Sequence, residues 1–136
     1  MYTLKIPYTD YNGEERNETF HFNLNKKELS DLNFEVDGGL EYYINKITET
    51  RNPKHLVDLV TSVIDKSYGV KSADGINFRK SEEILAEFKT REAYSELYTM
   101  LLSDADKLAD FINGITSAAR ASLEKSSSAP PRIANK

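Results

Sequence analysis

The chain has 136 residues, of which 29% are charged and 39% hydrophobic, with a formal net charge of −4 and no cysteine. This length fits a single soluble globular domain with one core. The acidic balance and the scattered Lys and Arg residues argue against general nucleic-acid binding, which needs clustered cations. The lack of cysteine excludes disulfides and thiolate metal sites. No apolar run reaches the roughly 18 residues that a membrane-spanning helix needs.

The first 24 residues predict a β-hairpin, because apolar and polar side chains alternate on both sides of the turn-forming pair Asn12-Gly13. A two-residue turn at this pair would place the two apolar sets on opposite faces of the hairpin. The sets share one face only if the numbers of paired residues have an even sum, as with Leu4 opposite Phe22. Because the buried face fixes the register, we predict a bulge or an odd-length loop near residues 8 to 16.

Three amphipathic helices are predicted after the hairpin, since apolar residues recur there at helical spacing. The first opens at a capping box, in which the side chains of Asn25 and Glu28 each bond the backbone of the other. The second is expected to begin at Asp37. The third begins at Asn52-Pro53, because Pro is favoured in the first helical turn, and Gly69 is its expected stop.

A short two-stranded excursion is predicted near residues 69–78, where Ser72-Ala-Asp-Gly75 suits a turn that ends in a left-handed glycine. Three further helices are then expected, with their starts at Ser81, at Thr90 and at Ser103-Asp-Ala-Asp106. Gly114 falls on the polar side of the last helix. We expect this glycine to weaken the helix by about 1 kcal/mol relative to Ala, and the helix to kink or break there.

Together these elements predict an α+β fold that is mainly α: an N-terminal β-hairpin, then a bundle of about six helices with the small β excursion near residues 69–78. Residues 1–125 are expected to form a single helical domain that includes the hairpin. Residues 126–136 are rich in Ser and Pro and lack apolar periodicity, so a disordered C-terminal tail is expected there.

The sequence contains no recognisable arrangement of catalytic or metal-ligating residues. Neither His21 nor His55 has a second ligand at helical spacing, so both are expected at the surface. Asp104 and Asp106 could pair at a metal, but carboxylates are favoured at a helix N-terminus in any case. The turn at Asp74-Gly75 lacks the carboxylates of a calcium loop. We therefore expect no catalytic residue, no metal site and no cofactor, and a small enzyme is a weak alternative.

Three stretches between residues 68 and 115 form a packing pattern: FRKSEEILAEF, then T-x-x-AY-x-x-L, then a helix capped by Ser-Asp that includes FINGI. In this pattern the segment resembles the tail assembly chaperones of long-tailed bacteriophages. The resemblance covers about a third of the chain, and the hairpin and the preceding helices agree with it in general character.

The resemblance implies a mainly helical, non-enzymatic protein of the host cytoplasm. Chaperones of this family coat the tape measure protein, keep it soluble, help to recruit tail tube subunits and leave before the virion is complete. The implied partners are therefore the tape measure protein, the tail tube protein and further copies of the chain, with no nucleic acid and no membrane. The family commonly makes a longer product by programmed frameshifting, for which the codons of Glu124-Lys125 are the expected place. A permanent virion component, such as a tail or head-completion protein, is the alternative.

Covering an apolar helix requires exposed aliphatic and aromatic side chains that meet it at helical spacing. The helices from Thr90 to Ala119 are dense in large apolar residues, so the partner surface is expected on them. The predicted partner-binding residues are Tyr94, Leu97, Tyr98, Leu101, Phe111, Ile112 and Ile115. Core packing is the alternative role for each of these side chains.

Overall fold

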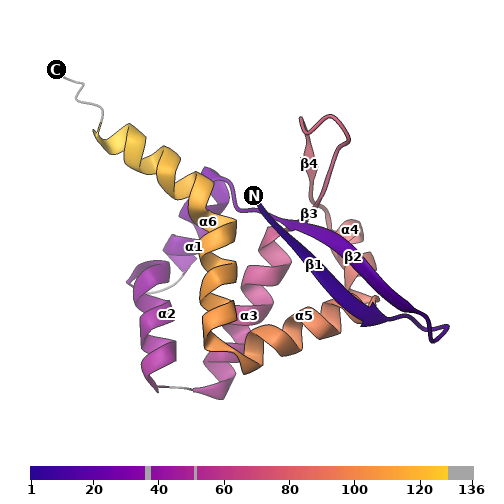
Figure 1. Ribbon diagram of the computed structural model, residues 1–136. Helices are drawn as coiled ribbons and strands as arrows, with labels where there is room; N and C mark the ends of the chain where they lie inside the picture. Colours follow the sequence, from indigo (N-terminus) through magenta and orange to yellow (C-terminus); the bar gives the residue numbers. More distant parts are fainter. Residues whose placement is uncertain (36–37, 51, 129–136) are drawn as a thin grey trace.

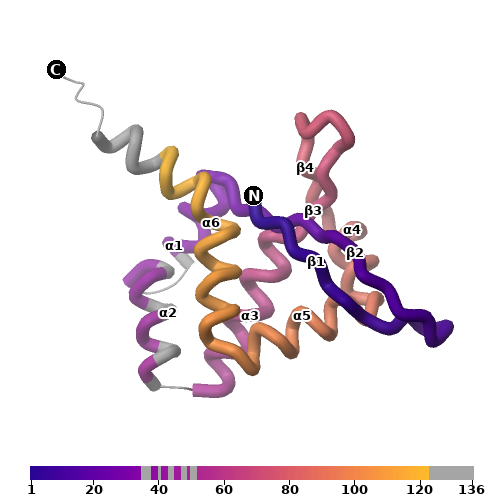
Figure 2. Tube along the Cα trace, viewed as in Figure 1, coloured from indigo at the N-terminus to yellow at the C-terminus, as the bar shows by residue number. Residues whose placement is uncertain are grey.

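The computed structural model describes residues 1–35, 38–50 and 52–128 (Figures 1 and 2). In chain order its elements are β1 (Tyr2–Thr9), β2 (Glu15–Phe22), α1 (Lys26–Glu35), α2 (Gly39–Thr50), α3 (Pro53–Ser67), β3 (Tyr68–Lys71), β4 (Phe78–Arg79), α4 (Glu82–Lys89), α5 (Glu92–Ser103) and α6 (Ala105–Ser128). This order confirms the predicted α+β class, with an N-terminal hairpin and a mainly helical remainder. Among the described residues, no helix is long and apolar enough to cross a membrane.

The hairpin has the even register that its apolar pattern requires. Leu4 pairs with Phe20 and Tyr2 with Phe22, so the numbers of paired residues sum to 24 and the apolar sets share one face. The connecting loop is residues 10–14, an odd-length loop as predicted. The expected pairing of Leu4 with Phe22 is wrong by two residues, because the loop is centred on Asn12, whereas that pairing would need a loop centred on Gly13.

The side chain of Asp10 explains the length of this loop. Its Oδ1 accepts hydrogen bonds from the backbone N–H groups of Asn12 at 2.9 Å and Glu14 at 3.0 Å. The backbone N–H of Asp10 also donates to the carbonyl of Glu14 at 2.8 Å, and this bond closes the loop. Asp at the first position of a turn commonly bonds the backbone two residues on. The five-residue loop therefore provides hydrogen-bond partners for its own backbone. It also gives the register that places both apolar sets on the buried face of the hairpin.

The predicted β excursion is present, and it belongs to the N-terminal sheet. The strand order is β1-β2-β3-β4 with antiparallel pairing throughout, and β3 meets β2 through Tyr68 opposite Phe22. Gly75 has φ of 78° in the turn between β3 and β4, as the sequence predicts. Gly69 was expected to end α3 but lies within β3. A Cβ there would lie 2.7 Å from a ring carbon of Phe78, so β3 and β4 approach closely at this glycine.

Most of the predicted helix starts are confirmed by their caps. The capping box is complete, because the backbone N–H of Asn25 donates to Glu28 at 3.0 Å and the N–H of Glu28 donates to Asn25 at 2.9 Å. The side chains of Asn52, Ser81 and Asp104 accept hydrogen bonds from backbone N–H groups in the first turns of α3, α4 and α6, respectively. Thr90 was expected to begin a helix, but it ends α4, and its hydroxyl donates to the carbonyl of Glu87. Asp37, the expected start of α2, lies outside the described residues.

The core lies between the inner face of the hairpin and the helices α1 and α3 to α6. It is rich in aromatic rings. The ring centroids of Phe22 and Phe111 are 5.1 Å apart, and Tyr68 stacks on Phe88 with 4.0 Å between the ring centroids. Helix α6 runs unbroken through Gly114 to Ser128, so the predicted break at this glycine is wrong. Its end is three residues beyond the expected domain boundary at residue 125, and residues 129–136 of the expected tail lie outside the described residues.

Candidate functional site

Most of the predicted partner-binding residues lie in the core of the folded chain. The five that are no more than 2% exposed are Leu97, Leu101, Phe111, Ile112 and Ile115. Helices α5 and α6 both contact strand β1 and each other, so their apolar stripes face inward. The burial of these five side chains fits core packing, which is the alternative role that the sequence suggests for them.

Tyr94 and Tyr98 are the predicted residues that reach the surface, where they are half-buried between α3 and α5. Their ring centroids are 6.2 Å apart and the rings are stacked. The hydroxyl of Tyr94 donates to Asp65 at 3.1 Å, and Thr61 lies 3.5 Å from the hydroxyl of Tyr98. Burial and, to a smaller extent, the Asp65 carboxylate raise the pKa of Tyr94. We call this surface, formed by Thr61, Asp65, Tyr94 and Tyr98, the tyrosine face.

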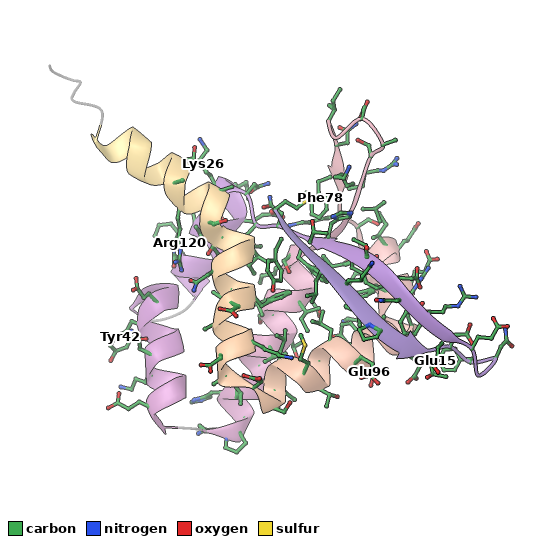
Figure 3. All side chains as sticks on the ribbon, in the orientation of Figure 1. Glu15, Lys26, Tyr42, Phe78, Glu96 and Arg120 are labelled. Atoms are coloured by element: carbon green, nitrogen blue, oxygen red, sulfur yellow. The ribbon has the colours of Figure 1, made fainter. Side chains whose placement is uncertain are left out.

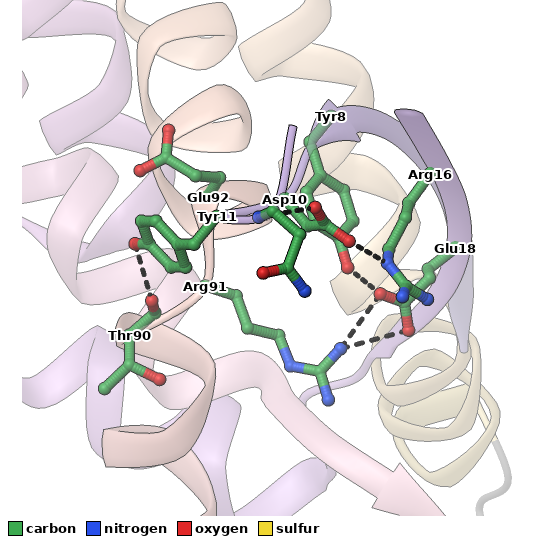
Figure 4. A pocket seen from close by; sticks show the side chains of 9 residues that line it. Tyr8, Asp10, Tyr11, Arg16, Glu18, Thr90, Arg91 and Glu92 are labelled. Atoms are coloured by element: carbon green, nitrogen blue, oxygen red, sulfur yellow. Dashed lines mark hydrogen bonds and ion pairs between the residues drawn. The ribbon is translucent and has the colours of Figure 1, made fainter. Parts of the chain in front are cut away.

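A second candidate region is an open cleft of about 470 Å³ at the tip of the hairpin (Figure 4). The hairpin supplies one wall and the junction between α4 and α5 supplies the other. The lining residues are Tyr8, Asp10, Tyr11, Asn12, Arg16 and Glu18 of the hairpin, and Thr90, Arg91 and Glu92 of the junction. We call it the hairpin-tip cleft. It joins segments that are more than 70 residues apart in the sequence, as shown by the bonds between Glu18 and Arg91.

Charged pairs hold the walls of this cleft in place. The Glu18 carboxylate accepts two bonds from Nη1 of Arg91, at 2.9 and 3.0 Å, and one from the hydroxyl of Tyr8. Nε of Arg16 lies 2.6 Å from Asp10, and this bond, with backbone bonds to the same carboxyl, lowers the pKa of Asp10. Three carboxylates and two guanidinium groups line the cleft, so its formal charge is −1.

Tyr11 has the more exposed of the two aromatic rings that line the cleft. It is 77% exposed, and its hydroxyl donates to the carbonyl of Thr90 at 2.8 Å. Desolvation and the nearby carboxylate of Glu92 raise the pKa of Tyr11. The cleft was not predicted from the sequence, although two signals were present: Asp10 at a turn-forming position, and Arg91 directly after Thr90, where a new helix was predicted to begin. Aromatic and charged side chains in this arrangement can recognise a protein surface.

A smaller cleft of about 160 Å³ lies between α2 and α6. Glu41 and Asn45 of α2 line one side of it, and Ile112, Asn113 and Arg120 of α6 line the other. Nη1 of Arg120 is 3.4 Å from the side-chain oxygen of Asn113. Ile112, one of the predicted partner-binding residues that are buried, therefore borders a recess in the surface.

The histidines are placed apart from each other. His21 lies on β2, where its Nδ1 is 3.2 Å from Thr3 of β1, and His55 is exposed in the first turn of α3. Within residues 1–35, 38–50 and 52–128, no three His, Cys, Asp or Glu side chains are arranged to hold a metal ion. Asp74 instead accepts bonds from Ser72 and from the backbone of Ile76, which keeps its carboxylate in the turn.

The chain is similar to a known protein family. A family model described as phage tail assembly chaperone matches residues 1–128. No curated protein and no solved structure is significantly similar to the chain. The match extends the resemblance of residues 68–115 to the hairpin and to every helix from α1 to α6. The chain therefore belongs to the phage tail assembly chaperone family.

Proposed function

We propose that this protein binds the tape measure protein during tail assembly, keeps it soluble and helps to recruit tail tube subunits, all in the host cytoplasm and without catalysing a reaction. The observation that carries the proposal is the family match over residues 1–128. A tape measure protein is a long helix with apolar stripes, and such stripes self-associate when they are exposed. A chaperone that covers them would need many weak contacts rather than one tight contact.

We propose the tyrosine face as the surface that contacts the tape measure protein. Tyrosine offers a large ring and a polar tip at a low entropic cost, and it is enriched where proteins meet. The bond from Tyr94 to Asp65 fixes one ring, and Lys89 in turn lies 2.9 Å from the same carboxylate. Tyr94 and Tyr98 are four residues apart on α5, so they lie on one side of the helix. On this proposal the buried residues of α5 and α6 do not contact the partner, but their packing in the core holds α5 in position.

Co-expression with the tape measure protein tests the general proposal. The tape measure protein is expected in the soluble fraction, bound to the chaperone, only when both are expressed. A tape measure protein that is equally soluble alone would contradict the proposal. Adding the tail tube protein is expected to give a complex of all three, because recruitment requires the chaperone and the tube subunit to bind together.

Paired substitutions test the tyrosine face. Tyr98→Glu is expected to reduce co-purification of the tape measure protein at least tenfold while the circular dichroism of the chaperone stays unchanged. Tyr42→Glu is the matched control, since Tyr42 is exposed on α2 and points away from the helical body (Figure 3). Tyr98→Ser, a milder change, serves if Tyr98→Glu does not fold. Normal co-purification by a folded variant would remove Tyr98 from the contact surface.

The composition of purified particles separates a chaperone from a permanent virion component. A chaperone is expected in infected-cell lysates and absent from finished particles, whereas stoichiometric amounts in particles would favour the structural role. We also propose a longer frameshifted product. This requires a slippery heptamer near the codons of Glu124-Lys125 and an overlapping downstream frame, and the gene sequence decides it directly.

A further inference from the structure

The chain contains two Asn-Gly pairs, Asn12-Gly13 in the hairpin loop and Asn113-Gly114 in α6. In such a pair the backbone nitrogen of Gly can attack the side-chain Cγ of the preceding Asn, because Gly has no Cβ to obstruct the approach. The side chains of both Asn residues are exposed. The two pairs therefore share the same local chemistry, and they differ in the backbone that surrounds them.

The hairpin loop leaves Asn12-Gly13 room to react. Gly13 has φ of 83°, and apart from its chain neighbours no atom lies within 4 Å of the position that a Cβ would occupy there. In the part of the chain that the structure describes, the side-chain amide of Asn12 has no hydrogen-bond partner. The N–H of Gly13 donates to the carbonyl of Asp10 at 3.0 Å. This bond lies at an exposed loop tip, where local opening costs little free energy.

The helix holds Asn113-Gly114 in an unreactive conformation. Ring closure requires rotation of the Asn backbone about its Cα–C bond, whereas the hydrogen bonds of α6 fix this angle. The carbonyls of Asn113 and Gly114 also accept bonds from the hydroxyls of Thr116 at 3.5 Å and Ser117 at 3.3 Å. The ring of Tyr2 occupies the space beside Gly114. Opening this backbone would therefore disrupt the contact between α6 and β1.

A third pair, Asp74-Gly75, lies in the loop between β3 and β4 and could form the same ring. Its leaving group would be a side-chain oxygen, which departs only from a protonated carboxyl group. Bonds from the hydroxyl of Ser72 at 2.6 Å and from the backbone N–H of Ile76 at 3.0 Å hold this side chain and lower the pKa of Asp74. The carboxyl group is therefore ionised at neutral pH, and its oxygen is a poor leaving group.

We propose that Asn12 is a site of spontaneous deamidation in the folded protein. The nitrogen of Gly13 forms a bond to Cγ of Asn12, and the Cγ–Nδ2 bond breaks. The proton that the Gly13 nitrogen loses is balanced by the proton that the amide group gains as it leaves as ammonia. Water then opens the succinimide ring. Cleavage between the ring nitrogen and Cγ gives Asp, and cleavage between the ring nitrogen and the main-chain carbonyl carbon gives isoaspartate.

The reaction changes both the charge and the geometry of the hairpin tip. Asn12 lines the hairpin-tip cleft, so one added carboxylate changes the formal charge of the cleft from −1 to −2. Isoaspartate also lengthens the main chain inside the loop that the bonds of Asp10 close. Deamidation therefore gives a more acidic cleft with a longer loop. This inference does not depend on tape measure binding.

Peptide mapping of the full chain by mass spectrometry tests the proposal. Protein is kept at pH 7 and at pH 9, both folded and in urea, and is then cut with trypsin after Lys and Arg. A sample taken at time zero corrects for conversion during digestion. The three pairs fall in separate peptides, residues 6–16, 72–79 and 108–120. Deamidation replaces NH2 by OH and so raises the peptide mass, and isoaspartate peptides are separated from Asp peptides by chromatography.

In the folded protein we expect Asn12 to convert at least about tenfold faster than Asn113 or Asp74, because the helix and the bonds of the second loop must open first. The rate at Asn12 is expected to rise with pH, since attack requires a deprotonated nitrogen. In urea the rates at Asn12 and Asn113 are expected to agree within about twofold, because unfolding removes the protection. Asn12→Ser, checked for folding by circular dichroism, is the matched control and is expected to form no acidic species on anion exchange.

Three results would overturn the proposal. The first is conversion of Asn113 or Asp74 as fast as that of Asn12 in the folded protein. The second is conversion of Asn12 in urea but not in the folded protein. The third is an acidic species that forms equally in the wild type and in folded Asn12→Ser.

Discussion

The ring of Tyr2 in β1 occupies the space that a side chain at position 114 of α6 would need. A Cβ built on Gly114 would lie 2.1 Å from Cδ1 of Tyr2 and 2.7 Å from its Cγ. The same tyrosine meets Phe111 edge to face, with 5.5 Å between the ring centroids. The glycine in FINGI is therefore a contact point between the last helix and the first strand.

This contact predicts that Gly114→Ala destabilises the protein, although Ala is the better helix former. The gain in helix propensity is about 1 kcal/mol, whereas overpacking a contact costs about 1–3 kcal/mol. We expect a net loss of roughly 1 kcal/mol in the free energy of unfolding by urea. In a Tyr2→Ala background the clash is absent, so the same substitution is expected to stabilise. Stabilisation by Gly114→Ala in the wild-type background would show that the ring of Tyr2 moves aside freely.

The bonds of Lys80 predict that Lys80→Met is strongly destabilising. The substitution removes one donor from the Glu28 carboxylate, which keeps its bond from the backbone N–H of Asn25, and it removes the Lys80 donor from the carbonyls of Asn23 and Lys66. The expected cost is about 2–4 kcal/mol in the free energy of unfolding. Lys27→Met is the matched control, because Lys27 forms an exposed ion pair with Asp31 and exposed pairs contribute little. Equal melting temperatures for the two variants would contradict a central role for Lys80.

Features that depend on residues close together in the sequence could be predicted, whereas features that depend on contacts between distant residues could not. The capping box at Asn25 and the left-handed Gly75 were predictable, because both depend on residues a few positions apart. Burial at α5 and α6 was not, since the same apolar spacing suits a partner surface and a core. The role of Gly114 was misread for a related reason: its partner, Tyr2, is over 100 residues away in the sequence. The hairpin-tip cleft was missed because Glu18 and Arg91 meet only in the fold.

The burial of the predicted partner-binding residues gives a further prediction. Leu97→Ala and Phe111→Ala are each expected to lower the free energy of unfolding by about 2–5 kcal/mol, as for other large-to-small changes in a core. Tyr42→Ala, at an exposed position on α2, is expected to leave the urea midpoint almost unchanged. Wild-type stability in Leu97→Ala or Phe111→Ala would contradict the core role and return these side chains to the partner surface.

The environment of Tyr94 predicts how stability depends on alkaline pH. Burial and the Asp65 carboxylate raise the pKa of Tyr94 above its value in the unfolded chain, near 10. Above this pH the unfolded chain loses the phenolic proton while the folded protein keeps it, so the free energy of unfolding falls as the pH rises. Tyr94→Phe has no such proton. At pH 8 it is expected to be less stable than the wild type by about 1 kcal/mol, because the bond to Asp65 is lost. Between pH 10 and 11 this difference is expected to shrink, as followed by urea unfolding at each pH, whereas parallel curves would contradict the coupling between Tyr94 and Asp65.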